Sequence, residues 1–154
     1  MRLEIFNREN AIDIYLKRIV KNDVPEDLQS ELRVYAVVQI CGYIERSMEV
    51  IILDRLQARG HPRLLEFVKS HFKIGINFKC PAIKSLLERF DLKWARSFQD
   101  FLDDHDEVVE AIGSAYTLRN QAAHGNAPSV GIVRVRELFD NAKIVIQAVI
   151  DATN

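Results

Sequence analysis

Apolar residues in this chain recur mostly three and four positions apart, which is the spacing of one face of an α-helix. Asn22 to Pro25 interrupts the first stripe, with Asp23 as a candidate cap and Pro25 suited to a first helical turn. Gly60 and Gly125 stand where helices are expected to stop. The stripes predict helices at about 7–21, 25–59, 62–72, 81–90, 94–102, 107–123 and 132–151.

The middle of the second predicted helix, residues 34–44, is apolar nearly all round. A helix of this kind is buried on most of its sides. In a chain of 154 residues, part of that burial is expected to come from a second subunit.

Composition supports a helical architecture. Only 6 glycines and 4 prolines are present, which suits a bundle better than a sandwich of many short strands. Hydrophobic residues at 48% and charged residues at 28% are typical of a globular protein. We therefore expect an all-α bundle of about six to seven helices, forming a single domain over residues 1–154.

Charge and cysteine content narrow the function classes. A net charge of −1 counts against broad, non-specific nucleic-acid binding, and no DNA partner is expected. Cys41 and Cys80 lack metal-site spacing and indicate reduced thiols. The opening residues, MRLEIFNREN, have no signal-peptide apolar region, and no run is suited to crossing a membrane. These features predict a cytoplasmic protein without a membrane partner.

The segment RNQAAHG, residues 119–125, is the most informative part of the sequence. It places polar residues in the last turns of a mostly apolar helix. Asn120 and His124, four apart, share one stripe, whereas Arg119 and His124 lie about 140° apart around an ideal helix. The arginine side chain would have to reach toward His124 of its own chain or of a second chain. The alternative is a pair that only neutralises the helix dipole and bonds the last carbonyls.

The chain resembles HEPN domains, whose motif is Arg-x4–6-His. The resemblance lies in the motif itself and in its position between a helix with an acidic start and a closing amphipathic helix. The chain is most similar to small prokaryotic HEPN proteins with the motif RN-x-x-AHG, which are RiboL-PSP-HEPN-like. The resemblance covers nearly the whole chain. It implies a homodimer in which the motif helices meet, and a metal-independent endoribonuclease of toxin–antitoxin or phage-defence type with RNA as substrate.

The resemblance implies catalytic roles for Arg119, His124 and Asn120, and the chemistry of these residue types agrees. RNA supplies its own nucleophile, the 2′-OH, so neither a metal nor another cofactor is expected. A histidine moves protons near neutral pH, and an arginine matches the geometry of a phosphate. Many HEPN toxins that pair with a nucleotidyltransferase antitoxin have a tyrosine two residues after the histidine. Asn126 stands there in this chain, so control by such an antitoxin protein is in question.

Two rival functions remain open. One is a non-catalytic HEPN-type module that binds a nucleotide, an RNA or an antitoxin through the same cleft, which the mild acidity favours. The other is a purely structural dimerisation domain.

Several further residues have two interpretations each. Glu45 either holds Arg119 from behind or pairs with Arg46, Arg33 or solvent. Tyr116 either stacks on a base or packs in the core, and Gln121 is a candidate supporting residue. Arg134 and Arg136, two apart, are either phosphate contacts beside the motif or solvated residues, and the acidic run 103–107 is interpreted as a helix cap, not a metal site.

Overall fold

The fold is a bundle of helices, as expected from the sequence. A computed structural model describes residues 1–20, 24–57, 60–72, 75–126 and 128–154. Within these ranges all regular structure is helical. The helices are α1 (Arg2–Ile19), α2 (Glu26–Gln57), α3 (Pro62–Phe72), α4 (Cys80–Phe90), α5 (Leu92–Asp103), α6 (Asp106–Ala123) and α7 (Ile132–Ala152).

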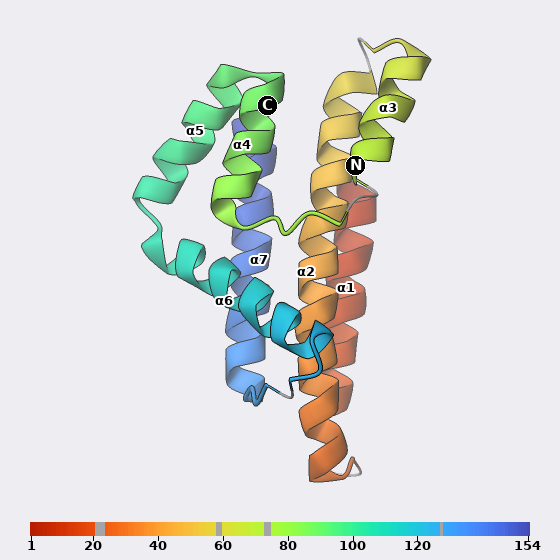
Figure 1. The fold of residues 1–154 in the computed structure, drawn as a ribbon, viewed down its shortest axis with the longest axis vertical. Helices are drawn as coiled ribbons and strands as arrows, with labels where there is room; N and C mark the ends of the chain where they lie inside the picture. The colour runs from red at the N-terminus through yellow and green to blue at the C-terminus, as the bar shows by residue number, and fades with distance from the viewer. Residues whose placement is uncertain (21–23, 58–59, 73–74, 127) are drawn as a thin grey trace.

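Helix α2 is the central element of the bundle. At 32 residues it is about 48 Å long. Helix α1 runs antiparallel beside it, α7 packs along it, and α3 packs near its C-terminal end (Figure 1). Helices α4 and α5 form a hairpin, with α5 packed against α7. Helix α6 lies obliquely across both α2 and α7, so its C-terminal end is supported by α2.

The core is continuous along α2 and α7 and is closed by α1, α5 and α6. Its fully buried side chains are almost all aliphatic or aromatic, which gives each helix one face to pack inward. The largest include Leu16, Ile40, Ile44, Met48, Ile51, Phe98, Ile112 and Tyr116.

The apolar segment at residues 34–44 is only partly covered by this chain. Val37, Ile40 and Ile44 are fully buried, whereas Tyr35 is 53% exposed and Val38 37% exposed. The expectation that a second subunit completes the burial therefore stays a prediction.

Two helix starts differ from the predicted ones. Helix α1 begins at Arg2, because Ile5 is buried on the same stripe as Ile12. Helix α5 begins at Leu92, because the carboxylate of Asp91 accepts a hydrogen bond from the backbone N–H of Lys93 at 2.7 Å and caps the helix. The proposed cap at Asp23 and the end of the first helix at Lys21 lie outside the described residues.

Cys41 and Cys80 are free, buried thiols, as predicted. In the described ranges, no helix combines the length and the apolar character needed to span a membrane.

Replacing Ile44 with alanine should lower the free energy of unfolding by about 2–5 kcal/mol, because the deletion leaves a cavity in a fully buried site. The same substitution at Ile14, which is 42% exposed on α1, is the matched control and should cost under about 1 kcal/mol. Urea unfolding followed by circular dichroism measures both. Equal losses would contradict a core centred on α2.

Candidate functional site

Helix α6 ends in a well-defined turn. The N–H of Asn126 donates to the carbonyl of Gln121 at 3.0 Å, and the N–H of Gly125 donates to Ala122 at 3.2 Å. This pair of bonds is a Schellman motif, which requires a left-handed residue. Gly125 supplies it with φ = 77°, a conformation that other residues adopt at a cost. The predicted helix end at Gly125 is confirmed.

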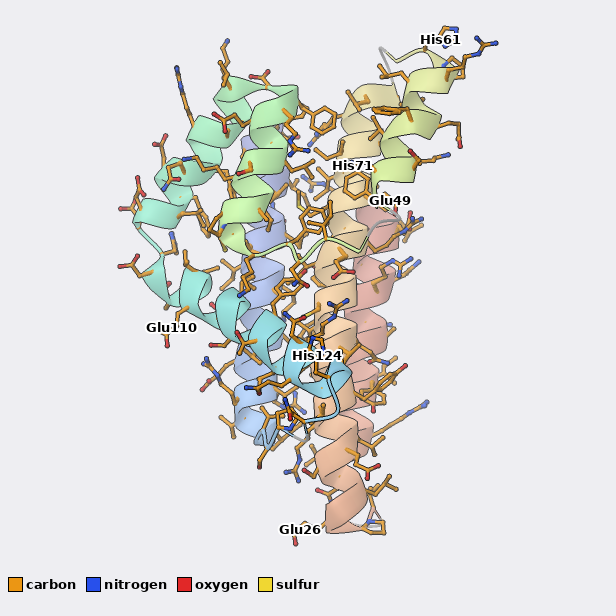
Figure 2. The ribbon with its side chains drawn as sticks, viewed as in Figure 1. Glu26, Glu49, His61, His71, Glu110 and His124 are labelled. Carbon is orange, nitrogen blue, oxygen red and sulfur yellow. The ribbon has the colours of Figure 1, made fainter. Side chains whose placement is uncertain are left out.

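His124 is the last residue before this turn and is exposed. Its backbone N–H donates to the carbonyls of Asn120 and Gln121, at 3.1 and 3.2 Å. Figure 2 shows His124 at the end of α6 that crosses α2. The backbone of His124 is thus fixed while its imidazole is open to solvent and to a ligand.

Arg119, one turn earlier, is held by three separate segments. Its Nη1 donates to Oδ1 of Asn77 at 3.0 Å and to Oδ1 of Asn120 at 3.3 Å. Its Nη2 lies 3.9 Å from Oε1 of Glu45 on α2. Among the interactions of the described residues, Nε and Nη2 make no hydrogen bond. The guanidinium is therefore oriented through one nitrogen, and its other N–H groups remain available.

Of the alternatives for Glu45, the structure supports proximity to Arg119. Arg46 pairs instead with Glu4 and Glu49, and Arg33 donates to Gln29. Oε1 of Glu45 is buried and has no hydrogen-bond partner in the described part of the chain. Burial raises the pKa of this carboxyl, and the charge of Arg119 opposes the rise.

Two further side chains near Arg119, those of Tyr116 and Cys41, are buried and uncharged at neutral pH. The core-packing interpretation of Tyr116 is confirmed: its side chain is fully buried, so it presents no face to a base. Burial raises the pKa of Cys41 to about 12, with a further rise from Glu45, so this thiol is protonated at neutral pH. Burial likewise raises the pKa of Tyr116. Arg119 is the cation of this cluster.

Asn77 was not identified from the sequence, in which it lies in the connector between the predicted helices at 62–72 and 81–90. The one sequence feature that could have pointed to Asn77 is that a polar amide stands between two apolar residues, Ile76 and Phe78. Of these two, Phe78 is buried. The side chain of Asn77 is half-buried, and its Oδ1 accepts a hydrogen bond from Arg119.

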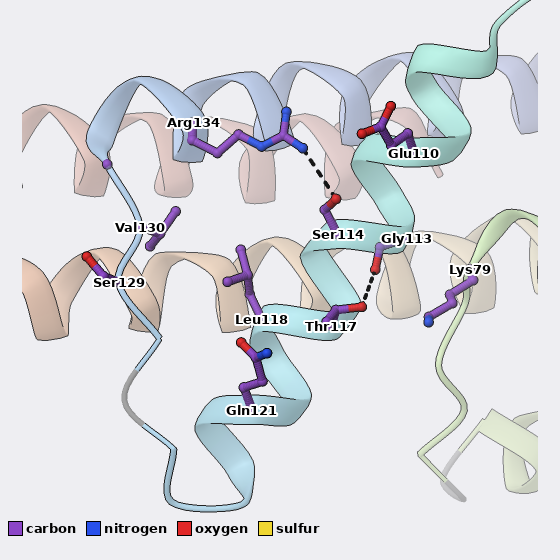
Figure 3. A pocket seen from close by; sticks show the side chains of 11 residues that line it. Lys79, Glu110, Gly113, Ser114, Thr117, Leu118, Gln121, Ser129, Val130 and Arg134 are labelled. Atoms are coloured by element: carbon purple, nitrogen blue, oxygen red, sulfur yellow. Dashed lines mark hydrogen bonds between the residues drawn. The ribbon is translucent and has the colours of Figure 1, made fainter.

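The predicted site residues are only partly brought together. Arg119, Asn120 and Glu45 form one cluster. No contact between Arg119 and His124 is found among the interactions of the described residues, consistent with their angular separation. Gln121 is exposed and points to another side of α6, where it lines a cleft (Figure 3).

The acidic run at 103–107 joins the end of α5 to the start of α6: His105 is at the N-cap position without a side-chain cap hydrogen bond, and Asp106 and Glu107 lie in the first turn of α6. The Nδ1 of His105 lies 2.8 Å from the carbonyl oxygen of Phe101, and its ring stacks on the Phe101 ring at 4.2 Å. In the described ranges, no group of three histidine, cysteine, aspartate or glutamate side chains is arranged to hold a metal ion.

Comparison with protein families gives one result. The family model described as RiboL-PSP-HEPN matches residues 3–154. Searches of curated proteins and of solved structures found no match.

Replacing Glu45 with glutamine should increase stability relative to wild type, and the increase should grow from about pH 4 to about pH 7. The folded pKa of Glu45 is raised, so its contribution to stability is fully present below the ordinary value and is lost as the pH rises through the folded value. Glutamine resembles the protonated form throughout.

Chemical unfolding at several pH values measures this difference. Glu31→Gln, which makes the same change at an exposed position of α2, is the matched control. A difference that shrinks toward neutral pH would show that attraction to Arg119 outweighs the effect of burial.

Proposed function

Since the chain belongs to the RiboL-PSP-HEPN family, we propose that it is a metal-independent endoribonuclease. Membership supports a ribonuclease or nucleotide-binding module. The observation that carries the more specific proposal is the oriented guanidinium of Arg119 on the same helix as the exposed imidazole of His124.

The reaction is an attack of the ribose 2′-OH on the adjacent phosphorus. The bond from 2′-oxygen to phosphorus forms, and the bond from phosphorus to the 5′-oxygen breaks. The products are a 2′,3′-cyclic phosphate and a 5′-OH. One proton leaves the 2′-OH and one reaches the departing 5′-oxygen, so the reaction needs a base and an acid.

His124 is the proton-transfer residue in this proposal, because imidazole accepts and donates protons near neutral pH. Arg119 binds the phosphate and stabilises the negative charge that builds on the phosphorane. Its Nε and Nη2 groups match two phosphate oxygens. Asn120 orients Arg119 through the 3.3 Å hydrogen bond, and Glu45 lies behind the guanidinium.

A homodimer would supply the geometry that this mechanism needs. Arg119 and His124 lie about 140° apart around one helix, and the guanidinium is oriented by Asn77 and Asn120. Two motif helices that meet would place the Arg119 of one protomer near the His124 of its partner. In that arrangement each of the two sites pairs one Arg119 with one His124.

The biological role that we propose is that of a toxin or phage-defence ribonuclease, with an antitoxin protein as a possible regulator. Expression without a partner should then slow growth of the host, and Arg119→Ala should relieve the effect. Normal growth at high expression would instead favour the binding module.

The non-catalytic binding module is the second candidate. It is supported by the net charge of −1 and by the separation of Arg119 and His124, between which the described part of the chain shows no interaction. Binding of RNA or nucleotide by a folded protein that cleaves nothing would establish it.

His124→Ala should lower RNA cleavage at least about 100-fold, because it removes the proton-transfer group. Wild-type and variant proteins are incubated with total RNA in EDTA, and the products are tested for cyclic-phosphate ends. His61→Ala, an exposed histidine before α3, is the matched control and should cleave normally. Cleavage by His124→Ala at the wild-type rate would rule out this assignment.

Mixing Arg119→Ala and His124→Ala proteins should restore cleavage above the level of either variant alone. After subunit exchange, mixed dimers hold one intact Arg119 and one intact His124, which together complete one site. Sedimentation velocity and a mass-tagged protomer verify dimerisation and exchange. A monomer, or a mixed dimer with no restored activity, would contradict the shared site.

A further inference from the structure

The cleft that Gln121 lines lies beside the motif and is not used by the proposed chemistry. It has a volume of about 690 Å³ and is formed by α6, residues 129–131 at the start of α7, and the end of the connector that precedes α4 (Figure 3). Its lining includes Lys79, Arg134, Ser114, Thr117 and Gln121.

The lining presents hydrogen-bond donors and positive charge. Nη2 of Arg134 donates to Oγ of Ser114 at 3.3 Å, which leaves the Ser114 hydroxyl proton available to a ligand. Lys79 makes no ion pair among the described residues. Arg134 pairs with Glu137 at 3.2 Å, but both side chains are about half exposed, so a phosphate can replace this weak contact.

The start of α7 adds further donors. Gly131 is the N-cap of α7, and its lack of a side chain means that no side-chain cap occupies the first N–H groups of the helix. These groups and the helix dipole favour an anion at the same end of the cleft as Arg134.

Glu110 also lines the cleft and opposes an anion. It stands one turn before Ser114 and about 16 Å from Gln121 along the helix axis. Its charge opposes an anion near Ser114, so the attraction for a phosphate has to come from Arg134 and Lys79.

The cleft and the motif are connected in two ways. Thr117 and Gln121 belong to a helical stripe that continues to His124, seven residues or about 10 Å beyond Thr117. On the other side, Asn77 orients Arg119 and Lys79, two residues later, lines the cleft. A strand bound at Arg119 and His124 can therefore follow α6 into the cleft.

We infer that this cleft binds a backbone phosphate of the RNA, at a position separated by several nucleotides from the cleaved bond. A stacked strand rises about 3.4 Å per nucleotide, so 10 Å corresponds to about three nucleotides. The inference rests on RNA being the substrate. It explains how a chain with a net charge of −1 holds RNA at a few defined points instead of along a basic surface.

Binding is measured by fluorescence anisotropy with a fully 2′-O-methylated oligonucleotide of about eight nucleotides, which lacks the nucleophile and is not cleaved. Arg134→Glu should weaken its binding at least about tenfold in 0.1 M salt, because one counterion-releasing contact is lost. The slope of log affinity against log salt should fall by about 1. Binding of a dinucleotide, too short to reach the cleft from the motif, should be unchanged.

Arg136→Glu is the matched control, with the same change on the same helix. The pKa of Asp13 on α1 is lowered mainly by Lys17, and Arg136 is among the cations that contribute, which places Arg136 on the α1 side of α7. The Arg136→Glu variant should bind both oligonucleotides as the wild type does. Lys79→Ala removes the cation on the opposite side of the cleft and is the second test. Circular dichroism verifies that each variant is folded.

Equal binding by the Arg134→Glu, Lys79→Ala and Arg136→Glu variants would overturn the inference, as would the absence of binding to the longer oligonucleotide. Cleavage of ordinary RNA is measured in parallel and separates the two proposals. If the wild type binds the longer oligonucleotide but cleaves no RNA, and Arg134→Glu loses that binding, the phosphate site in the cleft is supported and the nuclease proposal is rejected. If the wild type cleaves RNA and the cleft variants bind the longer oligonucleotide normally, the nuclease proposal is supported and the phosphate site in the cleft is rejected.

Discussion

The apolar surface of α2 is the constraint on which the rest of the structure depends. The middle third of α2 has few polar residues, so only a narrow strip of its surface can be exposed to water. The rest has to be covered by other helices. Helices α1 and α7 cover two sides along its length, and α6 crosses a third. The crossing brings the last turns of α6 over Glu45 and Cys41 of α2. The location of the motif is thus a consequence of core burial.

Burial also determines how Arg119 behaves. A long cationic side chain on an exposed helix would sample many rotamers, whereas here Asn77 and Asn120 accept hydrogen bonds from one nitrogen of the guanidinium. Ordering the side chain in the folded protein removes an entropy cost from ligand binding. His124, one turn later, lies beyond the core, and its backbone is ordered by the Schellman motif and Gly125.

Periodicity predicted the type of the helices and roughly their number, because most of them have one apolar stripe and the second is apolar nearly all round in its middle. It predicted the starts of α1 and α5 poorly, since a buried Ile5 and the Asp91 cap depend on which residues pack or bond nearby. The motif and Glu45 were also found from the sequence, through residue type and family resemblance. Asn77 was not, because its role arises only when the connector before α4 passes beside α6, a tertiary contact between residues 42 positions apart. The cleft near Lys79 and Arg134 was missed for the same reason.

A phosphate site at the end of α6 works against the helix dipole, because a helix C-terminus carries partial negative charge and repels anions. The first turn of α6 is acidic, which suits the helix but adds no attraction for RNA. Positive charge at the motif must therefore come from side chains, and α6 itself supplies only Arg119 and a protonatable His124 in its last turns. Further cations have to come from other segments, and Lys79 and Arg134 do so from the connector and from α7, whose N-terminus has the opposite, anion-attracting polarity. In the proposed mode of RNA binding, the opposed polarity of the two helix ends would lead a strand from the motif, where cations are favoured, to the start of α7, where phosphate is favoured.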